Sequence, residues 1–407
     1  MRRWIASPLW LLVLAGASTL RAQTPDTLHQ MFEAHQVFAL RDAAAHGHAP
    51  LFYRGAVEAS LNQMGPAQRD LRKIIRDGPH SKDAYDARDL LTNLYFRDGL
   101  YREALAEIEA EHVERPDAED VNNALPLFRA LGVAGDMSVV RRRGSRFMRV
   151  GDDHKMLPAK INGHDVMYGF DTGSAISVIG TADAKLLGLS PMRVETKLTE
   201  ASGSDIPGIS IAVAKDLVLG GLHLRNVAFF VLQDTGEPFV NVPVGSRGLI
   251  GLPVLIAMQA LRWERTGWFE LGSRALHQAA PAQNILFHNS TPVVQVGVKD
   301  KLLSMSFDTG AMDTDLNEGF AKAFPELVNA GQKEDRAITG FGGSNKYDSV
   351  LLGPVTFRIG GMSVTLKAPH VFVSHSLGNW DGNLGHDILD QAAAVTLDFR
   401  AMALVLE

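Results

Sequence analysis

The spacing of hydrophobic and polar positions changes once along the chain. From about residue 27 to residue 137, apolar residues recur three and four positions apart, as in "DARDLLTNLYF" and "YREALAEIEAE". This spacing puts apolar side chains on one face of a helix, so it predicts a helical region. After Met137, apolar and polar residues alternate in short β-branched runs separated by turn residues, which predicts strands. The sequence therefore predicts a helical N-terminal domain followed by a mainly-β region.

The helical region contains an internal repeat. Gly65 and Gly99 are 34 residues apart, and so are Val57 and Leu91, which is the period of tetratricopeptide repeats. The stretch "DGLYREALAEIEAEHVERP" resembles the second helix of such a repeat. We therefore predict a tetratricopeptide-like domain over residues 26–137, with an array of unrelated helical hairpins as the alternative. The resemblance implies a protein partner bound through this domain.

The β region reads as two copies of one framework. "MLPAKINGHDVMYGFDTG" aligns with "PVVQVGVKDKLLSMSFDTG", "LVLGGLHL" with "FRIGGMSV", and "GLIGLPVL" with "GNLGHDIL". Asp171 and Asp308 are 137 residues apart, and each is followed 32 residues later by a glycine, Gly203 or Gly340. We predict one lobe over 145–272 and a second over 285–407, joined by a Ser/Ala/Pro/Gln-rich linker at 273–284.

This ordered pattern resembles retropepsin-like and pepsin-like aspartic proteases, over about residues 147–407. The resemblance implies two mainly-β retropepsin-like (acid protease) lobes, each giving one aspartate, Asp171 or Asp308, to a shared catalytic cleft. It also implies a peptide or protein substrate, no cofactor and no metal. The other positions that match the family are the catalytic-loop residues Thr172, Gly173, Ser174, Thr309, Gly310 and Ala311 and the flap residues Gly203, Gly340, Phe341 and Gly342.

Two adjacent carboxylates suit amide hydrolysis. Held about 3 Å apart, they cannot both ionise and so share one proton, which leaves one as a base for water and one as an acid. The family resemblance suggests that Thr172 and Thr309 bond across to the opposing loop. Ala311 lacks the hydroxyl of Ser174, so we expect one carboxylate to lose a donor and the working range to be less acidic. Asn383 stands where the family has an aliphatic residue.

The first residues predict export. Arg2 and Arg3, an apolar stretch over 9–17 and small residues up to Ala22 predict a signal peptide over 1–22. An uncleaved membrane anchor is the alternative. We therefore expect a periplasmic or secreted protein with no stable membrane span after cleavage. The chain has no cysteine, which excludes disulfides and thiolate chemistry.

Other functions fit the sequence less well. A net charge of −6 without a long basic run argues against nucleic-acid binding. The string Asp313, Asp315, Asn317 lacks the glycine and glutamate positions of a calcium loop, so we predict a solvated or helix-capping cluster. His386 and Asp387 lie in no metalloprotease or hydrolase motif. Glycosidases also use paired carboxylates, but their chemistry does not require duplicated Asp-Thr-Gly lobes.

A catalytically silent peptide-binding protein is the main alternative, with the cleft and the helical repeats serving recognition. Both Asp-Thr-Gly tripeptides are intact, however, so we predict an aspartic endopeptidase that hydrolyses peptide bonds. The segment "VVRRRGSRFMRVGDD" between the predicted domains is either a processing site or a solvated basic strand or linker.

Overall fold

The structure is a computed structural model of the whole chain. The described residues are 25–46, 48–151, 155–198, 203–206, 208–234, 239–272, 283–373 and 378–407. The predicted signal peptide over 1–22 and nearly all of the predicted linker over 273–284 lie outside these ranges. In the part that is described, none of the helices is both long and apolar enough to cross a membrane.

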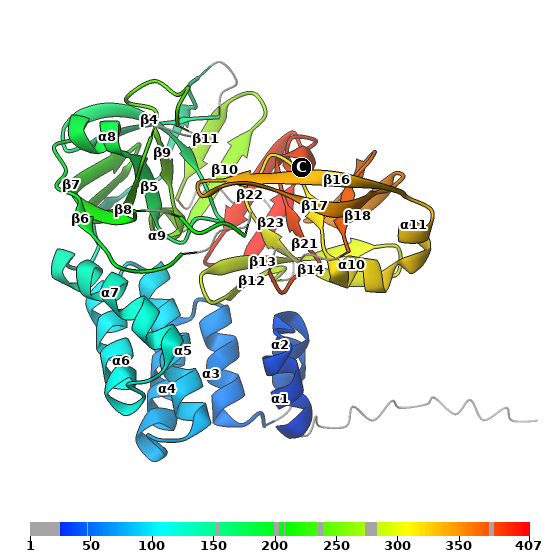
Figure 1. Cartoon of the computed structure of the whole chain (residues 1–407), viewed down its shortest axis with the longest axis horizontal. Helices are drawn as coiled ribbons and strands as arrows, with labels where there is room; N and C mark the ends of the chain where they lie inside the picture. Colours follow the sequence, from blue (N-terminus) through cyan, green and yellow to red (C-terminus); the bar gives the residue numbers. More distant parts are fainter. Residues whose placement is uncertain are drawn as a thin grey trace, which may run out of the picture.

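The N-terminal part of the chain is a row of antiparallel helices, drawn in blue and cyan in Figure 1. Their hairpins bury alanine and aromatic residues between them, among them Ala67, Ala87, Ala104 and Tyr95, because small side chains let neighbouring helices approach closely. The helices are α1 (Pro25–Glu33), α2 (Val37–Ala45), α3 (Leu51–Ser60), α4 (Met64–Asp77), α5 (Lys82–Arg97), α6 (Tyr101–Glu114) and α7 (Glu119–Ala134).

The first β lobe is built around an eight-stranded sheet of order β1-β8-β5-β9-β4-β3-β7-β6. Strands β5 and β8 inside the sheet are largely buried, whereas the edge strands β1 and β6 are exposed. Two short helices, α8 (Thr181–Leu186) and α9 (Leu252–Met258), complete the lobe. The strands are β1 (Ser138–Arg142), β3 (Leu157–Ile161), β4 (His164–Phe170), β5 (Ser177–Gly180), β6 (Met192–Arg193), β7 (Ser210–Leu219), β8 (Leu222–Leu232) and β9 (Gly248–Ile250).

The second lobe repeats this plan around the order β16-β17-β20-β15-β21-β14-β13-β18-β19, with β12 paired to β13. Its helices are α10 (Glu318–Ala323), α11 (Pro325–Asn329) and α12 (His386–Leu389). Its strands are β12 (Ile285–His288), β13 (Thr291–Val298), β14 (Lys301–Phe307), β15 (Asp315–Leu316), β16 (Gln332–Gly340), β17 (Gly343–Leu351), β18 (Val355–Ile359), β19 (Met362–Leu366), β20 (His370–Phe372) and β21 (Gly382–Leu384).

A third sheet joins the two lobes. Its order is β2-β11-β10-β22-β23, and β10 of the first lobe pairs antiparallel with β22 of the second, from Ala260 opposite Asp398 to Glu264 opposite Ala394. Because this sheet is continuous through main-chain hydrogen bonds, the lobes are held in a fixed relation across it. Its strands are β2 (Ser145–Met148), β10 (Ala260–Glu264), β11 (Trp268–Leu271), β22 (Ala394–Asp398) and β23 (Ala403–Leu406).

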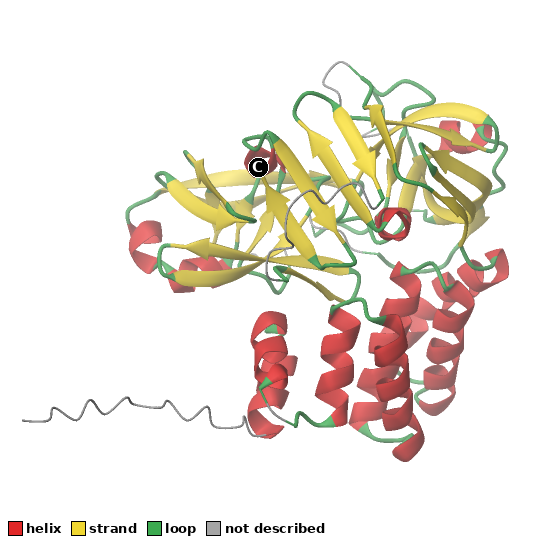
Figure 2. Cartoon of the chain, turned by 180° about the vertical axis from the view of Figure 1, so that it is seen from behind, coloured by secondary structure: helices red, strands yellow, loops and turns green. Residues whose placement is uncertain are grey.

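The helices lie along one side of both lobes, as Figures 1 and 2 show from opposite directions. Helix α7 reaches the first lobe, where the main-chain N–H of Lys197 donates to the Asn123 side chain at 2.9 Å. Helices α2 and α3 contact β12 of the second lobe. Strand β1, which carries Arg141 and follows α7, pairs with β8. The basic segment between helices and lobes is therefore an exposed edge strand of the first lobe.

The predicted fold class is confirmed at its coarser level: a helical N-terminal region precedes two mainly-β lobes with barrel-like sheets. The tetratricopeptide-like character of the helices remains a prediction.

Candidate active site

Both aspartates lie at the ends of equivalent strands. Asp171 follows β4, and its N–H donates to the Ile250 carbonyl oxygen of β9 at 2.9 Å. Asp308 follows β14, and its N–H donates to the Leu384 carbonyl oxygen of β21 at 3.1 Å. Each strand runs parallel to its partner, so both loops emerge at the same edge of their sheets. The hairpin repeat seen in the sequence thus delivers two aspartates in the same geometry.

The two threonines lock the loops together across the lobes. The Thr172 N–H donates to the Thr309 hydroxyl oxygen and the Thr309 N–H donates to the Thr172 hydroxyl oxygen, each at 3.0 Å. The Thr172 hydroxyl donates to the Phe307 carbonyl oxygen at 2.7 Å, and the Thr309 hydroxyl to the Phe170 carbonyl oxygen at 3.0 Å. Both threonines are buried, at 0% and 3% exposure. Four buried hydrogen bonds therefore fix the separation of the loops, the role that the family resemblance suggested.

The two glycines bring the carboxyl groups face to face. A Cβ added at Gly173 would lie 2.7 Å from the Asp308 carboxyl carbon, and one added at Gly310 would lie 2.7 Å from that of Asp171. Contacts this short do not occur with real side chains, so a Cβ at either position would displace the opposite carboxyl group, and the observed placement of the pair needs glycine at both. Each carboxyl group thus occupies the space that the glycine of the other lobe leaves open.

The pKa of Asp171 is raised well above its ordinary value. Burial is the main cause, and the negative charge of Asp308 and a hydrogen bond with its side chain add to it. The main-chain N–H groups of Gly173 and Ser174 oppose the rise by favouring the charged carboxylate. A protonated Asp171 hydrogen-bonded to Asp308 is the arrangement expected when two adjacent carboxyl groups share one proton.

The surroundings of the two aspartates differ. Asn383, on β21, directs its side-chain amide to a carboxyl oxygen of Asp308 at 3.4 Å. The Ser306 hydroxyl donates to the Asn383 amide oxygen at 2.7 Å, which turns the amide nitrogen toward the carboxylate. In the first lobe the equivalent strand pair is Gly169 and Leu249, which has no polar side chain. From the sequence, Asn383 was noted only as a departure from the aliphatic residue of the family, and Ser306 was missed. A comparison of "SFDTG" with "GFDTG" would have shown that only the second lobe has a serine at this position.

One expectation about the catalytic loops is wrong. Ser174 does not donate its hydroxyl to Asp171; it donates to the Ile176 carbonyl oxygen at 2.7 Å. The Ala311 N–H donates to Asp308 at 3.1 Å, a bond that needs no side chain at that position. The difference between Ser174 and Ala311 therefore lies away from the carboxylates. The polar asymmetry of the pair comes from Asn383 instead.

The predicted second-lobe flap is a long hairpin that reaches the first lobe. Strands β16 and β17 pair from Gln332 opposite Leu351 to Gly340 opposite Gly343, and their tip carries Phe341 and Gly342. The Phe341 ring lies 5.7 Å from the Phe239 ring, centroid to centroid, in an apolar cluster that includes Leu249. The hairpin therefore extends from one lobe to the residues beside Asp171.

The first-lobe flap is described only in part. Gly203 has a φ of +76°, a left-handed conformation that suits glycine in a turn. The residues before it, 199–202, are outside the described ranges. The neighbouring Ser204 hydroxyl oxygen accepts a hydrogen bond from the Asn345 side chain of β17 at 2.9 Å. The two predicted flap segments are therefore in contact.

In the described part of the chain, no group of three or more His, Asp or Glu residues is arranged so that it could hold a metal ion. Asp313 and Asp315 instead form ion pairs with Arg336 of the flap, at 3.1 and 2.6 Å. Asn317 occupies the N-cap position of α10, yet its side chain donates to the Trp380 carbonyl oxygen rather than capping the helix. Asp313 and Asp315 therefore tie the middle of β16 to the rest of the second lobe, and the prediction of a solvated or helix-capping cluster is wrong.

Comparison with known proteins finds a family match within the first lobe. Residues 157–254 match the family model described as aspartyl protease. A crystal structure of a retropepsin-like aspartic protease from Rickettsia conorii matches with 18% sequence identity, covering 33% of this chain and 92% of that chain, with a TM-score of 0.24. No curated protein matches the chain. The family match supports an aspartic protease family, and it includes Asp171 with its loop.

Proposed function

We propose that the two lobes form one aspartic endopeptidase site, in which a water held between Asp171 and Asp308 attacks a peptide carbonyl. The observation that carries this proposal is the reciprocal bonding of Thr172 and Thr309, which holds the two carboxyl groups against each other. A single chain then supplies both halves of the catalytic pair, so no second subunit is needed for the site.

A single proton shared by the two carboxyl groups suits amide hydrolysis. The carboxylate that lacks the shared proton takes a proton from the attacking water, and the protonated partner donates a hydrogen bond to the substrate carbonyl oxygen. The tetrahedral intermediate then collapses as a proton passes to the leaving nitrogen. Asn383 donates to Asp308 and so favours the charged form of that carboxylate. We therefore assign the base to Asp308 and the acid to Asp171.

The flap fits a substrate in extended conformation. Its strands β16 and β17 present exposed polar side chains over most of their length, and the Phe341 tip lies against the first lobe. A strand-like peptide beneath such a hairpin would form main-chain hydrogen bonds with it. Phe341 would then cover the reacting bond and exclude water from it.

The experiment that tests the proposal is cleavage of an unfolded protein across pH 3–8 by the full chain. Asp171→Asn and Asp308→Asn should each reduce cleavage by at least about 1,000-fold, because either change removes the shared proton arrangement. Asp300→Asn is the matched control, since Asp300 lies in an exposed turn of the second lobe. A statine-type compound should block the unaltered protein.

Circular dichroism of each variant separates loss of chemistry from loss of folding. A folded protein without cleavage at any pH would contradict the proposal, provided that cutting within the exposed segment at 139–144 does not release activity. That outcome would favour the peptide-binding alternative.

A further inference from the structure

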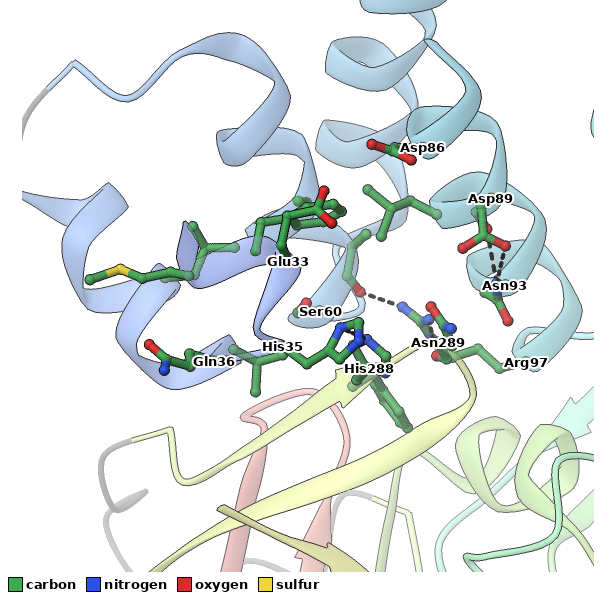
Figure 3. A pocket seen from close by; sticks show the side chains of 18 of the residues that line it. Glu33, His35, Gln36, Ser60, Asp86, Asp89, Asn93, Arg97, His288 and Asn289 are labelled. Atoms are coloured by element: carbon green, nitrogen blue, oxygen red, sulfur yellow. Dashed lines mark hydrogen bonds between the residues drawn. The ribbon is translucent and has the colours of Figure 1, made fainter. Parts of the chain in front are cut away.

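A cavity lies where the helical region meets the second lobe (Figure 3). Neither Asp171 nor Asp308 lines it. Its volume is about 210 Å³, enough for a long side chain but not for a folded partner. Helices α1, α2, α3 and α5 form its sides, and the turn between β12 and β13 closes one end with His288 and Asn289. The cavity belongs to neither the catalytic pair nor the flaps.

One wall of the cavity is polar and follows a single helix. Lys82, Asp86, Asp89, Asn93 and Arg97 recur three and four positions apart along α5, so they share one face of the helix. The stripe is about 22 Å long at 1.5 Å per residue. The facing walls are mainly apolar, with Phe32, Val37 and Leu40, and they also carry the polar residues Glu33, Gln36 and Ser60. A polar stripe of this length opposite an apolar wall suits an elongated ligand with both characters.

The end of the stripe near Lys82 carries a net negative charge. Lys82 forms ion pairs with Glu33 at 2.7 Å and with Asp86 at 2.8 Å, so these three groups carry a net negative charge. Asp89, one turn further on, accepts a hydrogen bond from the Asn93 side chain at 3.0 Å. No ion pair to Asp89 is found among the described residues. Its carboxylate faces the cavity.

The environment of Asp89 disfavours its charge. The side chain remains accessible to water in the cavity, but the surrounding protein raises its pKa to about 6, with burial as the main cause. The carboxylates of Glu111, Asp86 and Asp120 raise it further, and the hydrogen bond from Asn93 opposes the rise. A cation placed beside Asp89 would relieve this cost.

At the opposite end of the cavity, the charged group of Arg97 already has hydrogen-bond partners. The Arg97 guanidinium is fully buried and donates to the Asn62 side chain at 2.9 Å, to the Asn289 carbonyl oxygen at 2.7 Å and to the Ala59 carbonyl oxygen. His35 and His288 share a ring-nitrogen contact of 2.9 Å. Burial is the main cause that lowers the pKa of His288, to about 4, so that ring is neutral at neutral pH.

From this arrangement we propose that the cavity binds the side chain of an arginine or lysine in an extended peptide, with the cationic group paired to Asp89 and Asp86 and the neighbouring apolar residue against Phe32 and Leu40. Charge complementarity selects the cation, and the apolar wall and the length of the stripe select a peptide over a bare amine. The helical region would thereby recruit a basic segment of a partner or substrate. This proposal does not depend on hydrolysis at the other site.

Isothermal titration of the full chain at pH 7.5 tests it. The probe is a five-residue acetylated and amidated peptide with one arginine between leucines, and the matched probe carries citrulline, which has the same shape without the charge. We expect the arginine peptide to bind at least about tenfold more tightly. Mass spectrometry after each titration shows whether the peptide stays intact.

Asp89→Asn should remove most of this preference, because it keeps the bond with Asn93 and loses only the charge. Asp117→Asn, an exposed acid between α6 and α7, should leave the preference unchanged. At pH 6 the arginine peptide should release protons on binding, since a cation lowers the pKa of Asp89, and Asp89→Asn should abolish that release.

Three results would overturn the proposal: equal affinity for the arginine and citrulline peptides, an unchanged preference in a folded Asp89→Asn variant, or binding of agmatine as tight as that of the peptide. The last would indicate a small-amine site.

Discussion

The two lobes are alike at the Asp-Thr-Gly loops and differ two residues before each aspartate. Across the lobe boundary, Thr172 and Thr309 make equivalent hydrogen bonds, and Gly173 and Gly310 leave equivalent space for the opposite carboxyl group. Each half completes the other here, so a change in one lobe would need a matching change in its partner. Symmetry is kept where the lobes depend on one another.

The strand residues beside the two aspartates differ between the lobes. The strand neighbours of Asp308 are the polar Ser306 and Asn383, whereas those of Asp171 are Gly169 and Leu249. Leu249 also joins the apolar cluster that holds the flap tip. Two copies in one chain can diverge in this way, whereas two identical subunits cannot. The comparison therefore predicts which substitutions act equally in both lobes and which act differently.

The largest effect is expected at the glycines. Gly173→Ala and Gly310→Ala should each lower kcat/KM by about 100-fold or more, because the new methyl group would displace the opposite carboxyl group. Steady-state kinetics checks this, with Gly353→Ala as a control whose added Cβ meets nothing within 4 Å. A large loss in one glycine variant and none in the other would break the symmetry of the loops.

The threonines should come next, and stability is the readout. Thr172→Val and Thr309→Val should each lower the free energy of unfolding by about 2–4 kcal/mol, since each leaves a buried N–H and a buried carbonyl unpaired. The double variant should cost less than the sum, because the hydroxyls and amides form one network. Urea unfolding measures these values. Thr356→Val, on the surface, should change them by less than about 0.5 kcal/mol; additive costs would argue against a shared network.

The raised pKa of Asp171 makes stability depend on pH. In the folded state the group holds its proton to higher pH than in the unfolded chain, so its stabilising contribution is present at about pH 4 and is lost as pH rises through the folded pKa. Asp171→Asn removes that loss. Between pH 4 and the folded-state pKa of Asp171, the free energy of unfolding of the variant should therefore rise relative to that of the unaltered protein by up to about 1.4 kcal/mol per pH unit. Urea unfolding at several pH values checks this, and a pH-independent difference would contradict it.

The smallest effect should reveal the asymmetry. Asn383→Leu removes a donor to Asp308, so the acidic limb of the pH–rate profile should move upward by about half a pH unit, or about 0.7 kcal/mol. Leu249→Asn places the same donor beside Asp171 and should narrow the difference between the two carboxyl groups. An unchanged acidic limb in Asn383→Leu would show that the amide does not tune the pair.

The repeated pattern predicted the loops because local sequence determines them. A hairpin followed by Asp-Thr-Gly specifies a strand end and a tight turn, and its second appearance placed Asp308 opposite Asp171. The helical region and the β region could likewise be predicted, because apolar residues recur three and four positions apart in the first and alternate with polar residues in the second. These features depend on residues close together in the sequence.

Contacts between distant residues could not be predicted in this way. The Phe341 tip of the hairpin contacts Phe239 only once both lobes have folded. The Asn383 amide is oriented by the hydroxyl of Ser306, which is 77 residues away in the sequence. The cavity beside Asp89 needs helices and lobe together.

The most direct test of one shared site is calorimetric titration of the full chain with a statine-type inhibitor at acidic pH. If both lobes build one site, one inhibitor should bind per chain, and binding should be lost in both Asp171→Asn and Asp308→Asn. One inhibitor per two chains, or binding that survives either substitution, would contradict a single carboxylate pair built from the two lobes.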